Sequence, residues 1–357
     1  MHINNDNKLF VGMDLRKNSS SFCVKDYEGN ILRQEKVLTD KNQIRDFMRS
    51  LGQRASIVLE QVSQWYTYAD MLEQLGNDVH LAHPMKVKAI ASARIKTDKI
   101  DASVLADLLR SNLLPESYFA TKEVRTWKEL VRFRASLLNL RTQVKNKIHA
   151  ILHKHALRHT FSNLFGKGGR IWLAGLALEE PFKTNLNQYL SLIDVLTKQI
   201  DEAEQKVEQQ VADHPQAKLL TSIPGISYVS ALTIMAEIGD INRFPSAKQL
   251  MGYAGLVPST YSSGDTTRHG RITKTGSKWL RYIMTEAAHH QVLCKRQPGF
   301  GSYYLGLKKR KGSGTAAVAT ARKLLAVVWR LLKDNRPWQE VPPQRGTSGP
   351  LAPIVSS

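Results

Sequence analysis

The first third of the chain alternates short apolar runs with amphipathic stretches. Residues 8–14 (KLFVGMD) predict a buried strand that ends in an acid, and SSFCVKD and ILRQEKV predict two more strands. An amphipathic helix (KNQIRDFMRSLG), a strand (ASIVLE), a helix (WYTYADMLEQLG), a strand (DVHLAHP) and a closing helix (DASVLADLLRSNLL) follow. This order, βββαβαβα, is that of a ribonuclease H-like domain, a mixed sheet flanked by helices. Pro115 marks its end, so we assign residues 1–115 to this α/β domain.

The pattern then becomes helical over residues 116–212. An apolar stripe predicts one long helix from about Glu123 to Ala156. In the next helical stretch, an apolar residue recurs every seven positions, at Leu186, Ile193, Ile200 and Val207. This spacing is typical of a coiled coil or a helical hairpin. Two arrangements remain open: packing against the preceding long helix of the same chain, or a seam between two copies.

The rest of the chain predicts a mainly helical domain over residues 213–333. Residues 219–239 are typical of a helix-hairpin-helix, with a turn at Ile223–Ile226 and Ser227 as the cap of the second helix. Residues 255–281, from Gly255 to Arg281, read as a basic loop. The Pro/Gly/Ser-rich residues 334–357 predict a disordered tail. The fold class is therefore α/β plus all-α.

Charge identifies the kind of partner. The 357 residues contain 51 Lys and Arg against 31 Asp and Glu, a net charge of +20, which indicates a polyanion and above all nucleic acid. The two cysteines are far apart and form no zinc or disulfide pattern. No signal-peptide pattern and no run of 18 apolar residues occurs, so we expect a cytoplasmic protein and no membrane partner.

Three basic segments are candidate nucleic-acid-binding surfaces. Residues 122–158 contain ten Lys or Arg and two Glu, and residues 287–333 contain ten Lys or Arg and no acid. We read KKRKGSG, in the second of these, as a loop on a polyanion. The candidate residues are Arg132, Arg134, Arg141 and Lys145 on the long helix, Arg268, Arg271, Lys274, Lys278 and Arg281 in the basic loop, and Lys308, Lys309 and Arg310.

Four carboxylates could hold divalent metal. Asp14 ends the first strand and Glu60 the fourth, which are neighbours in a ribonuclease H-like sheet, and Asp98 and Asp101 share one helix face. Grouped carboxylates repel one another unless a cation lies between them, and two Mg²⁺ about 4 Å apart suit phosphoryl displacement. Taken singly, Asp98 could instead cap a helix, Asp101 could favour its dipole, and Glu60 could be a surface residue.

A serine could supply covalent chemistry. No P-loop occurs, so a chain that cuts and rejoins DNA must keep the energy of the phosphodiester in a bond, and a serine–phosphate ester would do so. GLVPSTYSSG contains Ser259, which we expect in a turn, and the adjacent Ser262 and Ser263, between which the residues alone do not decide. Two other functions remain open: a Holliday-junction-type nuclease that uses water, and a non-catalytic nucleic-acid scaffold.

Four motifs occur along the chain in the order VGMD, VLE, KTDKIDA and GLVPSTYSSG. Over residues 8–333 the chain resembles the DEDD transposases of insertion sequences (family one-ten type), which are bridge-RNA-guided recombinases. The resemblance implies that Asp14, Glu60, Asp98 and Asp101 form the metal-binding tetrad of a RuvC-like domain, with Mg²⁺ or Mn²⁺. It also selects Ser263 as the nucleophile of the second, transposase domain.

The same resemblance implies the partners. They are donor and target double-stranded DNA, an element-encoded noncoding guide RNA, and further copies of the chain, as a dimer assembling to a tetramer with a composite active site. The chain departs from the family in one place. Relatives often carry a glycine shortly after the glutamate, whereas EQVSQWY has none, so no role is transferred to that segment.

Overall fold

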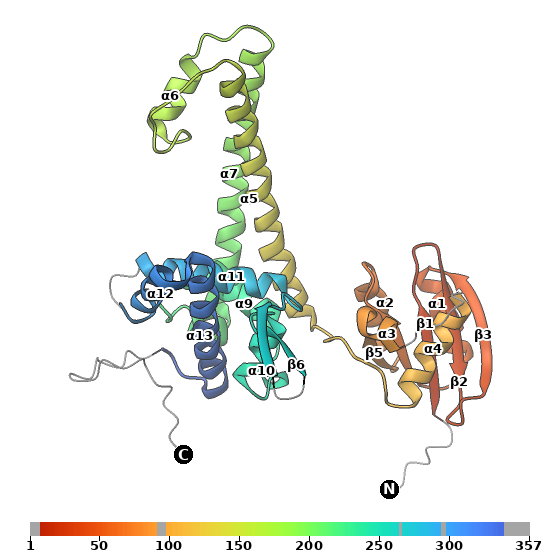
Figure 1. The fold of residues 1–357 in the computed structure, drawn as a ribbon. Coiled ribbons are helices and arrows are strands. Elements are labelled where there is room, and N and C mark those ends of the chain that lie inside the picture. The colour runs from red at the N-terminus through yellow and green to blue at the C-terminus, as the bar shows by residue number, and fades with distance from the viewer. Residues whose placement is uncertain (1–7, 91–97, 264–265, 294–297, 339–357) are drawn as a thin grey trace. The chain divides into compact units, whose positions relative to one another are not determined.

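The computed structural model describes residues 8–90, 98–263, 266–293 and 298–338 (Figure 1). The chain divides into two compact units, Met1–Phe119 and Ala120–Ser357, and each unit is described by itself. No helix among the described residues is long and apolar enough to cross a membrane.

The first unit contains one five-stranded sheet in the order β3-β2-β1-β4-β5. β1 pairs in parallel with β4, which pairs in parallel with β5, whereas β2 runs antiparallel to both β1 and β3. This is the mixed ribonuclease H-like sheet that the sequence predicted. Its elements are β1 (Leu9–Asp14), β2 (Ser19–Lys25), β3 (Ile31–Leu38), α1 (Lys41–Ser50), β4 (Ala55–Glu60), α2 (Trp65–Gln74), β5 (Asp78–Ala82), α3 (Pro84–Ile90) and α4 (Asp98–Arg110).

Helices cover both faces of this sheet. On one face, α1 and α2 contribute Ile44, Phe47 and Leu72 to a core that includes Val11 and Ile57. On the other face, α4 packs against β1 and β2 (Figure 1). The middle strands β1 and β4 are buried on both faces, which explains why they read as continuous apolar runs rather than as alternating ones.

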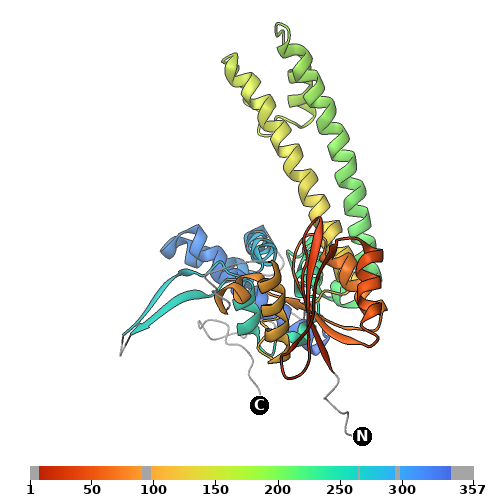
Figure 2. The ribbon, with the colours of Figure 1, turned by 90° about the vertical axis from the view of Figure 1, so that its right-hand side faces the viewer.

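The second unit is built on a long helical hairpin of α5 (Lys122–Lys154) and α7 (Phe182–Asp213), joined through α6 (Lys167–Gly175). Both ribbon views show α5 and α7 side by side (Figures 1 and 2). Leu186, Ile193 and Ile200 are buried in one cluster with Val144 and Ile148 of α5. Of the two arrangements left open, the structure therefore has packing within one chain. A seam between two copies through the buried residues Leu186, Ile193, Ile200 and Val207 was wrong.

The remaining helices gather at the base of the hairpin (Figure 1). The predicted cap is confirmed, because the Ser227 side chain accepts a hydrogen bond from the Ser230 amide at 3.3 Å. Gly225, in the turn before it, has φ +79°, which favours glycine. The elements are α8 (Pro215–Leu220), α9 (Tyr228–Ile238), η2 (Ile241–Arg243), α10 (Ala247–Tyr253), β6 (Pro258–Ser263), β7 (Thr266–Ile272), α11 (Lys278–His290), η3 (Gln291–Leu293), α12 (Pro298–Lys311) and α13 (Ser313–Asp334).

Two predicted loops are regular structure instead. The segment that carries the serines is an antiparallel β-hairpin, in which β6 pairs with β7. Residues 308–311 (KKRK) form the last turn of α12. Helix C-termini carry partial negative charge, so four cations are favourable there, and Gly312 with φ +80° ends the helix. Both segments lack the apolar periodicity that identifies strands and helices from sequence.

The packing of the hairpin gives a first prediction. Ile193 is 2% exposed, so Ile193→Ala leaves a cavity and should lower the free energy of unfolding by about 2–5 kcal/mol. Val195 lies on the same helix and is 51% exposed, so Val195→Ala should change it by less than about 0.5 kcal/mol. Urea unfolding followed by far-ultraviolet circular dichroism measures both. Equal effects of the two substitutions would contradict the hairpin packing.

Candidate active site

The ends of two neighbouring strands define the candidate catalytic edge. β1 and β4 run parallel with Gly12 opposite Val58 and Met13 opposite Leu59, and the strands end at Asp14 and Glu60. The carboxyl ends of parallel strands meet at one edge of a sheet, so the strand pairing brings these two acids to the same edge, as the sequence predicted.

A glycine sets the third acid beside this edge. A Cβ atom at Gly12 would lie 1.9 Å from the carbonyl oxygen of Ala102 and 2.7 Å from the amide nitrogen of Ala106. The backbone of α4 can therefore approach β1 only where the strand has no side chain. This contact holds Asp101, the residue before Ala102, next to the end of β1. The sequence signal was a glycine inside an otherwise apolar strand, a position for which no role was predicted.

One arginine joins the two acids. The Arg16 Nε donates to Asp14 Oδ2 at 2.8 Å, and Arg16 Nη2 lies 3.7 Å from Asp101 Oδ2. The Asp14 side chain is only 13% exposed, whereas that of Arg16 is 49% exposed. Gln64, after β4, donates from Nε2 to the Arg16 carbonyl oxygen at 2.8 Å and so fixes this segment. Sequence reasoning missed both Arg16 and Gln64.

This arrangement fits a divalent cation. Two hard carboxylate oxygens converge on a single positive group, and carboxylates are the ligands that Mg²⁺ and Mn²⁺ prefer. Among the described residues, however, no group of three or more His, Cys, Asp or Glu side chains is placed to hold a metal ion. The Asp98 side chain lies outside the described residues, although its backbone begins α4. The tetrad of Asp14, Glu60, Asp98 and Asp101 therefore stays a prediction.

The serine-bearing hairpin begins with a structural serine. Ser259 Oγ donates to the carbonyl oxygen of Arg271 at 3.1 Å, and a Cβ atom at Gly270 would lie 2.4 Å from that Oγ. Ser259 thus belongs to strand pairing rather than to the expected turn. The backbones of Ser262 and Ser263 pair opposite Thr267 and Thr266, and the side chains of both serines lie outside the described residues.

The cations beside this hairpin have different surroundings. Four are exposed, whereas Arg281 is half-buried and donates from Nη1 to the Ala254 carbonyl oxygen at 2.9 Å. Arg281 therefore has a structural partner, which the sequence did not indicate. The exposed residues are Arg268, Arg271, Lys274 and Lys278.

A buried carboxylate contacts the segment that follows the β6–β7 hairpin. Glu237 of α9 is 5% exposed and accepts from Arg132 Nη2 at 3.0 Å and from Ser277 Oγ at 2.8 Å. Ser277 also caps α11 by accepting from the Leu280 amide at 3.0 Å. Burial lowers the pKa of nearby Lys128, and the Glu237 carboxylate opposes that effect. Sequence reasoning missed Glu237, although a lone acid in the apolar run TIMAEIG is a signal of a paired buried charge.

The candidate nucleic-acid-binding cations of α5 also have partners inside the chain. Besides Arg132, Arg134 donates from Nε to Glu204 Oε1 at 2.7 Å, and Arg141 donates from Nη1 to Thr197 Oγ1 at 3.2 Å. Lys145 Nζ lies 4.9 Å from the Phe165 ring centroid, and burial, with Arg141 and Arg170 nearby, lowers the pKa of Lys145. Arg134 and Arg141 therefore join α5 to α7, Arg132 joins α5 to α9, and Lys145 lies against the segment between α5 and α6. These structural roles were not predicted from the sequence. Lys308, Lys309 and Arg310 are exposed on α12.

A ribonuclease H-like sheet with acids converging at its strand ends, followed by a basic helical unit, defines the class of phosphoryl-transfer enzymes that act on nucleic acid. Comparison with protein-family models gives the family. The DEDD domain model of IS110 elements, described as "Transposase", matches residues 11–156, and the model described as "Transposase IS116/IS110/IS902 family" matches residues 217–305. The chain belongs to this transposase family, and it is an enzyme of phosphoryl transfer.

Full-length relatives agree with this assignment. A "Probable family 20 transposase" of Pseudomonas aeruginosa is 25% identical over 337 residues, covering 90% of this chain and 96% of that protein. The transposase for insertion sequence element IS1328 of Yersinia enterocolitica is 26% identical, covering 90% and 96%. The transposase for IS1111A of Coxiella burnetii is 27% identical, covering 90% and 89%.

The contact between β1 and α4 gives a second prediction. Gly12→Ala forces backbone apart at 1.9 Å, so it should lower the free energy of unfolding by at least about 1–3 kcal/mol and abolish DNA cleavage. Gly306→Ala is the control, because a Cβ atom at that helical glycine would have no neighbour within 4 Å. This substitution should raise the free energy of unfolding by about 0.5–1 kcal/mol. Thermal unfolding and a cleavage assay measure the effects. A Gly12→Ala protein with normal stability and cleavage would contradict the close approach.

Proposed function

We propose that this transposase is an RNA-guided DNA recombinase that cuts, exchanges and rejoins donor and target DNA through a covalent serine–phosphate intermediate. The observation that carries the proposal is the convergence of the Asp14 and Asp101 carboxylates on Arg16 at the end of β1. Carboxylates held in this way attract a cation, and metal-assisted cleavage of a phosphodiester needs one at the reacting phosphate.

The metal ligands would be Asp14, Glu60, Asp98 and Asp101. A divalent cation bound there would polarise the phosphoryl oxygens and stabilise the leaving oxygen. The chain's own residues prepare that site: Gly12 admits α4, and Gln64 holds the Arg16 backbone. Because Arg16 is about half exposed, its guanidinium can move into solvent when a cation takes its place.

Ser263 would be the nucleophile. Its Oγ attacks the phosphorus and loses its proton to a base, so a serine–phosphate ester forms while the phosphodiester bond breaks and the departing DNA oxygen is protonated. In rejoining, a DNA hydroxyl attacks the ester and releases the serine hydroxyl. The exposed cations of β7 and α11, Arg268, Arg271 and Lys278, would hold the DNA backbone and offset the charge of the transition state.

The partners would be donor and target DNA, a noncoding guide RNA and further copies of the chain. The carboxylates belong to the first unit and Ser263 to the second, which is compatible with an active site composed from different subunits of a dimer or tetramer. With Ile193 and its heptad partners buried, a second copy needs another apolar surface. Phe133 and Leu140, seven residues apart on α5, are 57% and 45% exposed and offer one.

The carboxylates give a third prediction. Asp14→Ala and Asp101→Ala should each reduce DNA cleavage at least about a hundredfold, because the metal loses a ligand, while thermal unfolding changes little. Asp46→Ala, on the exposed face of α1, should cleave normally. Cleavage should also stop in excess EDTA and return with Mg²⁺ or Mn²⁺. Undiminished cleavage in EDTA would exclude the metal site.

The serines give a fourth prediction. Ser263→Ala should bind DNA normally but form no covalent protein–DNA adduct on a denaturing gel with labelled DNA, because the attacking oxygen is gone. Ser262→Ala is the matched control and should keep much of the activity. An adduct that persists in Ser263→Ala and vanishes in Ser262→Ala would show that the neighbouring serine is the nucleophile. Cleavage without any adduct in the unaltered protein would instead indicate a nuclease that uses water.

A further inference from the structure

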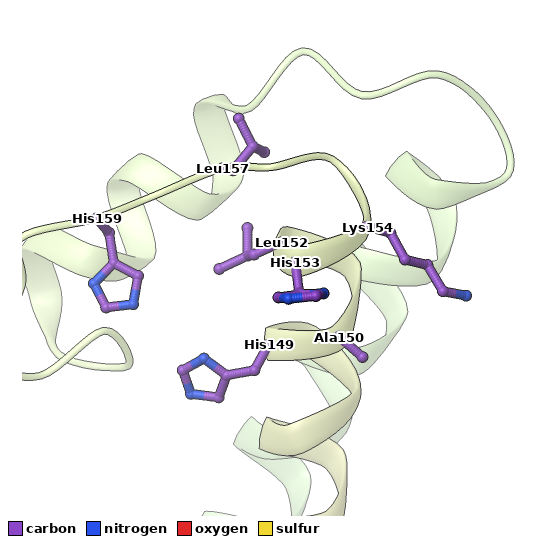
Figure 3. Close-up of a pocket in the computed structure, with 7 residues that line it drawn as sticks. All are labelled: His149, Ala150, Leu152, His153, Lys154, Leu157 and His159. Atoms are coloured by element: carbon purple, nitrogen blue, oxygen red, sulfur yellow. The ribbon is translucent and has the colours of Figure 1, made fainter.

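The tip of the α5–α7 hairpin contains a pocket that the proposed chemistry does not use. The cavity has a volume of about 620 Å³ and is lined by three histidines, His149, His153 and His159, together with Leu152 and Leu157. Figure 3 shows the His149 and His159 rings turned toward the same space. Ala150 and Lys154 also line the pocket, and Lys154 Nζ lies 6.0 Å from the Phe182 ring centroid.

Further flat rings lie next to the histidines that line this pocket. The His149 ring centroid lies 6.2 Å from that of His159 and 5.5 Å from that of Phe165. His159 in turn lies 6.2 Å from Phe161 and 6.0 Å from Trp172. Aromatic side chains of this kind are platforms on which unpaired bases stack.

One residue that lines the pocket also has a polar atom without a partner in the described part of the chain. Nδ1 of His159 is buried and has no hydrogen-bond partner among the described residues. A buried polar atom without a partner costs free energy, so a ligand that reaches it with a donor or acceptor is favoured. The edge of a nucleobase carries both kinds of group.

The positive charge at the tip of the α5–α7 hairpin favours a polyanion as the ligand. Residues 145–183, which run from the end of α5 through α6 to the start of α7, contain seven Lys or Arg and two Glu. One of these cations, Arg170, is paired across the hairpin with Asp194. A metal is not the ligand that fits, because the described histidines are not grouped as metal ligands are.

We propose that the pocket lined by His149, His153 and His159 binds an unpaired nucleotide of RNA. Its base would stack on the His149 and His159 rings, and its phosphates would face the surrounding cations. Duplex DNA keeps its bases stacked inside the helix, whereas folded RNA presents unpaired bases in loops and bulges. The inference rests on the proposed function, in which a guide RNA is a partner, and it assigns that RNA a contact at the tip of the α5–α7 hairpin.

The test compares RNA affinity among ring variants of the full chain. The probes are the labelled RNA that copurifies with the unaltered protein, a single-stranded DNA of the same sequence, and duplex DNA. His149→Ala and His159→Ala should each weaken RNA binding about five- to a hundredfold, the range for loss of one stacked base, and leave duplex DNA binding unchanged. His159→Phe should restore most of the RNA affinity, because it keeps a flat ring. Ile171→Ala, beside Trp172 and 75% exposed, is the matched control and should bind RNA normally.

A direct contact can be mapped as well. RNA that contains 4-thiouridine should crosslink on irradiation to peptides from residues 149–172, and the crosslink should disappear in His159→Ala. Ring variants that bind RNA as tightly as the unaltered protein, or equal losses for single-stranded DNA and RNA, would overturn the RNA pocket alone. An unaltered protein that binds no RNA would overturn the guide RNA of the proposed function, and this inference with it.

Discussion

The buried carboxylate of Glu237 is the interaction on which the second unit depends. An ionised carboxylate removed from water costs several kcal/mol unless charged and polar groups compensate for the lost hydration. Arg132 of α5 and Ser277 before α11 supply that compensation, and they come from distant parts of the chain. One buried charge thereby fixes the long hairpin, α9 and the start of α11 with respect to one another. The β6–β7 hairpin ends only five residues before Ser277, so the same charge anchors the segment that carries the serines.

The first unit uses the same electrostatic rule with a different outcome. Asp14 is also nearly buried and also pairs with an arginine, but Arg16 is half exposed and Asp101 is more than a third exposed. A pair that still contacts water can separate at low cost, whereas removing Arg132 would strand a charge in the interior. The degree of burial therefore distinguishes a permanent structural ion pair from an ion pair that can give way to another cation.

Much of the fold could be predicted from the sequence because it depends on apolar periodicity. The buried runs that end at Asp14 and Glu60 predicted neighbouring strands, and the heptads from Leu186 to Val207 predicted a long helix with one apolar side. Periodicity does not say which partner covers an apolar side, so the choice between a hairpin and a dimer needed the structure. Apolar periodicity also gives no prediction for segments that consist mainly of polar residues. The β6–β7 hairpin and the basic end of α12 were therefore read as loops.

For the candidate site, too, some features could be predicted from local sequence and others depend on packing partners. The types of residue at the strand ends indicated carboxylate chemistry, but the features that hold them in place are contacts between residues far apart in sequence. Gly12 has its effect through Ala102, and Gln64 through the carbonyl of Arg16. The partners of Arg134 and Arg141 on α7 could likewise not be known before the two helices were paired. A count of cations overstates how many are available to phosphate.

The length of the α5–α7 hairpin sets a fixed distance between its base and its tip. At 1.5 Å per residue, the 33 residues of α5 extend for about 50 Å, and the histidine pocket lies at the C-terminal end of this helix. That span equals the length of about fifteen base pairs of B-form duplex at 3.4 Å each. Because two packed helices resist bending, a nucleic acid held at the tip would keep a constant spacing from the base of the hairpin. Inserting or deleting whole helical turns in both helices would then change where along its substrate the protein acts.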